Sequence, residues 1–164
     1  MKCASFFKTL IPFFKTLIPH CLKFHGKSIF PSSKMKGWWV DSGAACHVTY
    51  CKDGMANFTA IREKICMATC SYSSEVIGMG TVELPLPNGR TLTLTDVFYC
   101  PDIGVNLISV SMLDKIGFET NFKGGVVTLK QNDAVLANAI LEGEAYKLVL
   151  SPDISSDCVT ITTL

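Results

Sequence analysis

The sequence predicts a mainly β fold with one short helix, and three observations lead to this class. Beyond the first forty residues, short runs of β-branched and aromatic residues alternate with turn residues. The pair Asn88-Gly89 separates two such runs and is the strongest hairpin signal in the chain. Only residues 109–116 show a helical pattern, with Ser109 as the candidate N-cap and Gly117 as the stop.

Residues 1–37 are predicted to form a basic, weakly ordered leader and linker. The heptad Phe-Phe-Lys-Thr-Leu-Ile-Pro occurs twice in succession, at 6–12 and 13–19, and the proline that ends each copy breaks a helix. Two short copies cannot bury the shared core of a repeat protein. We therefore interpret them as a duplication in a tail whose sequence can change without effect on the fold. The domain is expected to span 38–150, followed by a loose tail at 151–164.

The strands expected in this domain are short and lie between glycine or proline turns. The first strand leads into Asp41. A hairpin joins 81–86 to 90–99, and its second arm alternates polar and apolar residues with the period of a half-buried strand. Further strands are expected at 118–122, 126–130, 135–140 and 146–150. Many short strands at close spacing favour a closed barrel or a sandwich.

Charge and cysteine content limit the partners and the compartment. Residues 1–40 hold seven lysines and no acidic residue, whereas 41–164 hold eight basic and fourteen acidic residues. Lysines spread over a tail without a binding fold do not predict nucleic-acid binding. No stretch is long and apolar enough to span a bilayer, and no signal with a cleavage site is present. We therefore expect an intracellular protein, cytoplasmic or nuclear, whose eight cysteines are mostly free thiols.

The tripeptide Asp41-Ser42-Gly43 is the candidate catalytic motif. A turn at the end of a buried strand holds an aspartate carboxylate in a fixed position, and Ser42 can hydrogen-bond to it. Gly43 allows the close backbone approach that such a turn needs. Because the same tripeptide is common in ordinary turns, the motif gains meaning only from the rest of the chain.

Several segments, taken in order, resemble the protease region of copia-type retrotransposon Pol polyproteins. The resemblance covers about two thirds of the chain. It rests on Trp38-Trp39-Val40-Asp41-Ser42-Gly43-Ala44 with His47 and Thr49, on Gly78-Met79-Gly80-Thr81-Val82, on Val97-Phe98-Tyr99-Cys100-Pro101-Asp102, on Asn106-Leu107-Ile108-Ser109-Val110, and on Gly143-Glu144-Ala145-Tyr146-Lys147-Leu148.

This resemblance implies a retropepsin-like closed β-barrel that acts as an aspartic endopeptidase without a cofactor or metal. Asp41, Ser42 and Gly43 would form the catalytic turn. A glycine-rich flap would cover the substrate, and it comprises Val76, Ile77, Gly78, Met79 and Gly80. The mechanism needs two carboxylates that share one proton, and the chain has one such motif. The expected assembly is therefore a C2 homodimer, with a polypeptide, the polyprotein itself, as substrate.

Three alternatives compete with this interpretation. Cys46, His47, Cys51, Cys66 and Cys70 could bind zinc, but their spacings are not those of a zinc ribbon or knuckle, which favours a neutral, partly buried His47. A Cys-His nucleophile fails because neighbouring side chains of a strand point to opposite faces. The main alternative is a catalytically inactive, transposon-derived β-barrel fragment that is inert or serves as a binding domain.

Overall fold

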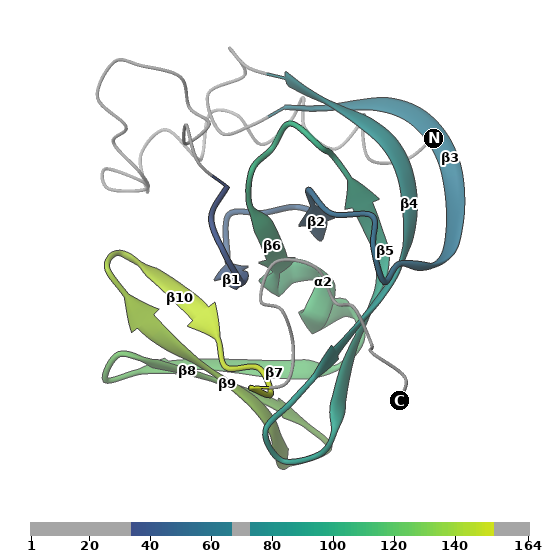
Figure 1. The fold of residues 1–164 in the computed structure, drawn as a ribbon. Helices are drawn as coiled ribbons and strands as arrows, with labels where there is room; N and C mark the ends of the chain where they lie inside the picture. Colours follow the sequence, from purple (N-terminus) through teal and green to yellow (C-terminus); the bar gives the residue numbers. More distant parts are fainter. Residues whose placement is uncertain (1–33, 67–72, 153–164) are drawn as a thin grey trace.

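The computed structural model describes residues 34–66 and 73–152 (Figure 1). These residues form a mainly β fold with one short helix, as the sequence predicts. In chain order the elements are β1 (Trp38–Asp41), β2 (Val48–Thr49), β3 (Ala56–Cys66), β4 (Ser73–Pro85), β5 (Thr91–Tyr99), β6 (Asn106–Ser109), α2 (Val110–Lys115), β7 (Phe118–Lys123), β8 (Val126–Gln131), β9 (Ala134–Glu142) and β10 (Ala145–Leu148).

All described strands belong to one sheet, in the order β3-β4-β5-β2-β6-β1-β10-β9-β8-β7. The long ribbons β3 to β5 lie on one side of the molecule and the hairpins β7 to β10 on the other, with β1, β2, β6 and α2 between them (Figure 1). In contrast to the closed barrel that the sequence predicts, the hydrogen-bonded ladder stays open, because β3 and β7 are its two edges. The sheet curls instead around a common core.

Strand β1 lies at the centre of this sheet and has neighbours from distant parts of the chain. It runs parallel to β6, with Asp41 in register with Ser109. It runs antiparallel to β10, with Val40 in register with Tyr146. Trp38, Trp39 and Val40 are all buried. A central strand with both edges paired is a rigid support for the residue at its end.

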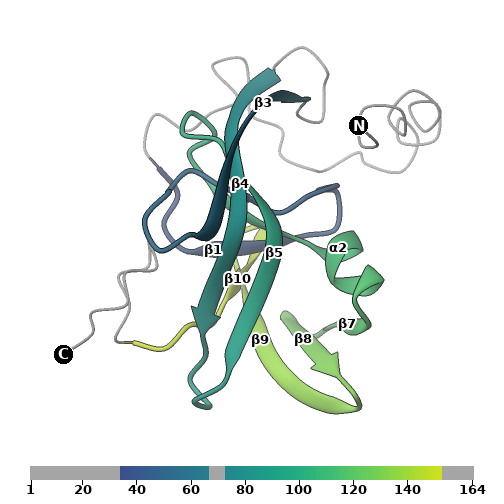
Figure 2. The same ribbon diagram turned by 90° about the vertical axis from the view of Figure 1, so that its right-hand side faces the viewer.

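The β4–β5 hairpin forms where the sequence predicts it, and it twists along the length of the molecule (Figure 2). Gly89 has a φ of 75°, the left-handed conformation that favours glycine at the last position of a three-residue hairpin loop. The N–H of Leu86 donates to the carbonyl of Arg90 at 2.8 Å and closes the turn. The Asn88 amide donates to the Leu136 carbonyl at 2.9 Å, so the turn is also attached to β9.

Helix α2 begins and ends as the sequence predicts. The Ser109 hydroxyl accepts the N–H of Met112, which is the contact that defines an N-cap. Gly117 follows the helix with a φ of 83°, a conformation that favours glycine at a helix C-terminus. No helix in residues 34–66 and 73–152 is long and apolar enough to cross a membrane.

The buried side chains form two clusters. The larger cluster joins the two sides of the curled sheet and includes Val40, Leu84, Leu94, Ile108 and Leu129. The smaller cluster lies beneath the β3–β4 ribbon and contains Val48, Tyr50, Val76, Phe98, Cys100 and Ile103. Because β1 and β6 contribute to the larger cluster, apolar burial anchors the strand that carries Asp41.

Candidate active site

Asp41 ends β1, and the next two residues turn outward into solvent. The Asp41 side chain is partly exposed, whereas Ser42 and Gly43 are exposed. The N–H of Gly43 donates to Asp41 Oδ1 at 2.7 Å. A Cβ at Gly43 would lie 3.3 Å from the same oxygen, so a larger residue would crowd the carboxylate. The turn therefore presents a carboxylate of fixed orientation at the surface.

Ser109 supports this turn from the adjacent strand. Its side chain is fully buried, and its hydroxyl donates to the Ala44 carbonyl at 2.6 Å. Its backbone N–H donates to Nδ1 of His47 at 3.0 Å. One residue at the start of α2 thus binds the chain both three and six residues after Asp41. From the sequence Ser109 was predicted only as a helix cap and as part of the resemblance.

His47 is neutral and buried, in agreement with the sequence-based expectation of a neutral, partly buried histidine. Its carbonyl accepts the N–H of Phe98 at 2.9 Å, and its Nδ1 can accept the N–H of Ser109 only while that nitrogen carries no proton. Burial lowers the pKa of His47 from 6.5 to about 4. The imidazole is therefore an internal hydrogen-bond acceptor rather than a solvent-facing base.

This shift predicts an acid-dependent loss of stability. Between pH 6.5 and 4 the unfolded chain binds a proton at His47 that the folded chain does not, so acid favours unfolding. We expect the group to lower the free energy of unfolding by about 2 to 3 kcal/mol between pH 7 and 4. Urea unfolding of the wild type and of His47→Asn at several pH values measures the difference. Equal slopes for the two proteins would show that His47 titrates normally.

Asn106 holds the two ends of the segment that contains the turn. Its Nδ2 donates to the Gly37 carbonyl at 3.1 Å, just before β1. Its Oδ1 accepts from Thr49 Oγ1 at 2.8 Å and from the N–H of Tyr50 at 3.2 Å, just after β2. Asn106 is fully buried. From the sequence Asn106 is only part of the resemblance, and its structural role is hidden because its partners lie 56 to 69 residues away.

The predicted flap residues lie within β4. Val76 is buried in the smaller core cluster, while Ile77 is exposed. A Cβ at Gly78 would overlap the ring of Phe58 on β3, and a Cβ at Gly80 would lie 2.8 Å from the Ala56 carbonyl. The two glycines therefore allow β3 to pack closely on β4. Residues 67–72, which join these two strands, lie outside the described part of the chain.

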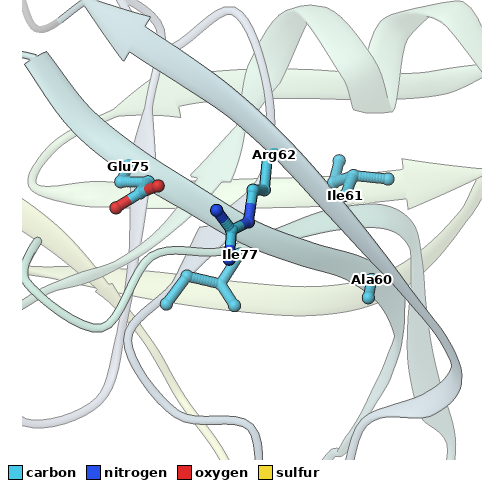
Figure 3. Close-up of a pocket in the computed structure, with 5 residues that line it drawn as sticks. All are labelled: Ala60, Ile61, Arg62, Glu75 and Ile77. Carbon is cyan, nitrogen blue, oxygen red and sulfur yellow. The ribbon is translucent and has the colours of Figure 1, made fainter.

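An open cavity of about 550 Å³ lies on the same ribbon (Figure 3). Its lining residues come from β3 and β4 and are Ala60, Ile61, Arg62, Glu75 and Ile77. The Asp41 turn does not contribute to it. The cavity is thus a feature of the ribbon rather than of the candidate catalytic turn.

The described cysteines differ in state. Cys46 and Cys100 are not disulfide-bonded, whereas Cys51 is disulfide-bonded. Burial first, and then the neighbouring Cys46 and Asp102, raise the pKa of Cys100 to about 12. Cys100 is thus a buried thiol that stays protonated. Among residues 34–66 and 73–152, no group of three or more His, Cys, Asp or Glu residues could hold a metal ion.

Comparisons with known proteins place this geometry in a family context. The chain is 31% identical over 115 residues to a retrovirus-related Pol polyprotein from transposon TNT 1-94 of Nicotiana tabacum, a match that covers 67% of this chain. It is 34% identical over 83 residues to a putative transposon Ty5-1 protein of Saccharomyces cerevisiae, which covers 51% of this chain. Residues 38–118 match the model of the Pol polyprotein β-barrel domain. The chain carries a retrotransposon Pol region.

The Pol region accounts for a small part of one relative and half of the other. The aligned residues span 8% of the tobacco protein and 53% of the yeast protein. The family match begins at the first residue of β1 and ends at the first residue of β7, so it includes Asp41, His47, Asn106 and Ser109. No solved structure matches the chain significantly. The resemblance to Pol is confirmed, whereas the protease and copia-type assignments stay predictions.

Proposed function

We propose that this chain is one subunit of a retrotransposon-type aspartic endopeptidase, with Asp41 as its catalytic carboxylate. The observation that carries the proposal is the turn at the end of β1. There a partly exposed carboxylate is oriented by the Gly43 N–H, and Ser109 fixes the following residues. The Pol β-barrel match over 38–118 includes this turn. A carboxylate held in this way can bind and polarise a water molecule.

The chemistry needs a partner carboxylate. One carboxylate accepts a proton from water while the other donates a proton to the carbonyl oxygen of the scissile bond. Two close carboxylates share one proton because both cannot be ionised together. The proposal supplies the second group as Asp41 of another copy, related by a two-fold axis. Exposure of Ser42 and Gly43 leaves this turn accessible to such a copy.

The peptide substrate would lie between this turn and the β3–β4 ribbon. Ile77 is an exposed apolar side chain on that ribbon, and Val76 anchors it to the smaller core. In this proposal Val76 to Gly80 of each copy cover the substrate, and the polypeptide of the element itself is the natural target. Gly78 and Gly80 let β3 pack closely on β4 within this ribbon.

The Asp41→Asn variant of the full chain tests the proposal directly. Activity on a denatured protein mixture at mildly acidic pH should fall at least about a thousand-fold. The asparagine can still accept the Gly43 N–H, so the turn should persist. Asp133→Asn is the matched control, because Asp133 lies in an exposed turn with a φ of 61° that asparagine also adopts.

Mixing the two proteins tests the shared site. If each active site takes one Asp41 from each copy, wild-type homodimers should make up about a quarter of all dimers in an equimolar mixture of wild type and Asp41→Asn after exchange, compared with about half before exchange. The activity of the mixture should therefore be lower than that of the same amount of wild type diluted with an inactive protein that does not exchange subunits. A folded wild-type protein that is monomeric and inactive would contradict the proposal and support a catalytically inactive Pol-derived binding domain.

A further inference from the structure

We propose that His47 and Ser109 act as a positioning pair that sets the place of the Asp41 carboxylate. The inference rests on the proposed function, since it assigns a role to two residues that do not themselves meet the substrate. Each contact in the pair is internal to the chain. The pair is also distinct from the Asp41 turn, because neither side chain bonds to Asp41, Ser42 or Gly43 in the described hydrogen bonds.

The first step of the argument is register. Ser109 is the partner of Asp41 in the parallel β1–β6 ladder, so the two residues occupy the same level of the sheet. Any displacement of Ser109 along or out of β6 therefore acts at the end of β1. Ile108, which precedes Ser109, is fully buried in the larger cluster and anchors the end of β6 there.

The second step is that Ser109 binds the chain that follows the turn at two points. Its hydroxyl donates to the Ala44 carbonyl at 2.6 Å, and its N–H donates to His47 Nδ1 at 3.0 Å. Ser111 adds a hydroxyl 3.0 Å from that of Ser109. The chain after Asp41 is thus held from the side of α2, while the Gly43 N–H holds the carboxylate itself.

The third step concerns the choice of an imidazole at position 47. The N-cap of α2 needs only the Ser109 hydroxyl, which accepts the Met112 N–H at 3.2 Å. The contact to His47 is additional, because it uses the Ser109 N–H at the point where β6 ends and α2 begins. His47 is 2% exposed, and its carbonyl accepts the N–H of Phe98. Burial of the ring and this backbone bond hold the imidazole beside Ser109. Its role as a hydrogen-bond acceptor for Ser109 explains why the polar residue His47 is buried next to the exposed Asp41 turn.

The test compares three variants of the full chain. His47→Leu removes the acceptor, Ser109→Ala removes the hydroxyl, and His47→Asn keeps a neutral acceptor oxygen near the place of Nδ1. We expect His47→Leu and Ser109→Ala to lower kcat at least about tenfold with little change in KM, because a misplaced catalytic group slows chemistry more than binding. His47→Asn should recover most of that loss. Leu129→Ala, on β8 in the larger core cluster, controls for lost stability because Leu129 makes no hydrogen bond to the turn segment.

A second measurement does not depend on activity. The amide resonance of Gly43 reports its hydrogen bond to Asp41 Oδ1 and can be followed by NMR in each folded variant. It should shift in His47→Leu and in Ser109→Ala but not in His47→Asn or Leu129→Ala. An unchanged Gly43 resonance in folded His47→Leu or Ser109→Ala would overturn the pair, even if the wild type is a protease. An inactive wild type that shows the expected shifts would refute the proposed function and retain the pair. If His47→Leu does not fold, Ser109→Ala decides.

Discussion

Replacement of Asn106 by leucine is expected to lower the free energy of unfolding by about 4 kcal/mol. The side chain is fully buried and accepts from Thr49 and Tyr50 while it donates to Gly37. Leucine has a similar volume, so the change removes hydrogen bonds without leaving a large cavity. The Gly37 carbonyl and the Tyr50 N–H would each lose the bond to Asn106, while Thr49 Oγ1 can still donate to the Cys51 carbonyl at 3.2 Å. A buried polar group that loses its bond costs about 1 to 3 kcal/mol.

Urea unfolding at pH 7, followed by tryptophan fluorescence, measures this loss. Trp38 and Trp39 lie next to Gly37, so their emission reports the affected segment. Asn138→Leu is the matched control, because Asn138 is exposed on β9 and its side chain should cost less than about 0.5 kcal/mol to replace. A loss at Asn106 as small as the control would show that its contacts do not hold the ends of the turn segment.

Replacement of Gly80 by valine is expected to cost about 3 to 4 kcal/mol, close to the upper range for overpacked sites. A Cβ there would lie 2.8 Å from the Ala56 carbonyl oxygen and 3.1 Å from Met55 Cε. The first contact is with backbone, which cannot rotate away as a side chain can. Strand β3 would have to move off β4 near the ladder pair of Ala56 and Thr81.

Gly78 allows a clash with a side chain to be compared with the backbone clash at Gly80. A Cβ at Gly78 meets only the Phe58 ring within the shortest distances, so Gly78→Ala should be relieved when combined with Phe58→Ala. Gly80→Val should gain nothing from Phe58→Ala. Thermal unfolding of the single and double variants tests both statements, and relief of the Gly80 variant would contradict the backbone explanation.

The parts of the fold that were predictable from the sequence depend on adjacent residues. The β4–β5 turn follows from Asn88 and Gly89, because Gly89 adopts a left-handed φ at low cost and the Asn88 side chain accepts the Arg90 N–H at 3.1 Å. The limits of α2 follow from the Ser109 cap and from Gly117 in the left-handed region. In both cases the determinants lie within one turn of the element that they define.

Strand β3 could not be predicted because its periodicity is broken. Its partly buried residues Phe58, Ile61 and Ile65 are three and four residues apart, which is not the alternation of a strand. Two irregularities in its pairing with β4 cause this spacing, and Asn57 has a φ of 52° near the first of them. As an edge strand, β3 also lacks the continuous apolar face of a buried strand.

For the candidate site, the sequence predicted the turn but not its support. Asp41, Ser42 and Gly43 are contiguous, so a motif can reveal them. The contacts of Ser109 with Ala44 and His47 join residues 65 and 62 positions apart. Such contacts depend on the parallel pairing of β1 with β6, which no local pattern encodes.

The placement of β1 between β6 and β10 also affects how the chain folds during its synthesis on the ribosome. The strand that carries Asp41 gains its first neighbour only when residue 109 has been made, and its second only when residue 148 has been made. Until then Trp38, Trp39 and Val40 form an apolar stretch without a sheet to cover it. Pairing across such long separations is slow, and waiting segments of this kind are sites for chaperones and for aggregation. A nascent chain would therefore complete the support of the Asp41 turn only after β6 and β10 have left the ribosome.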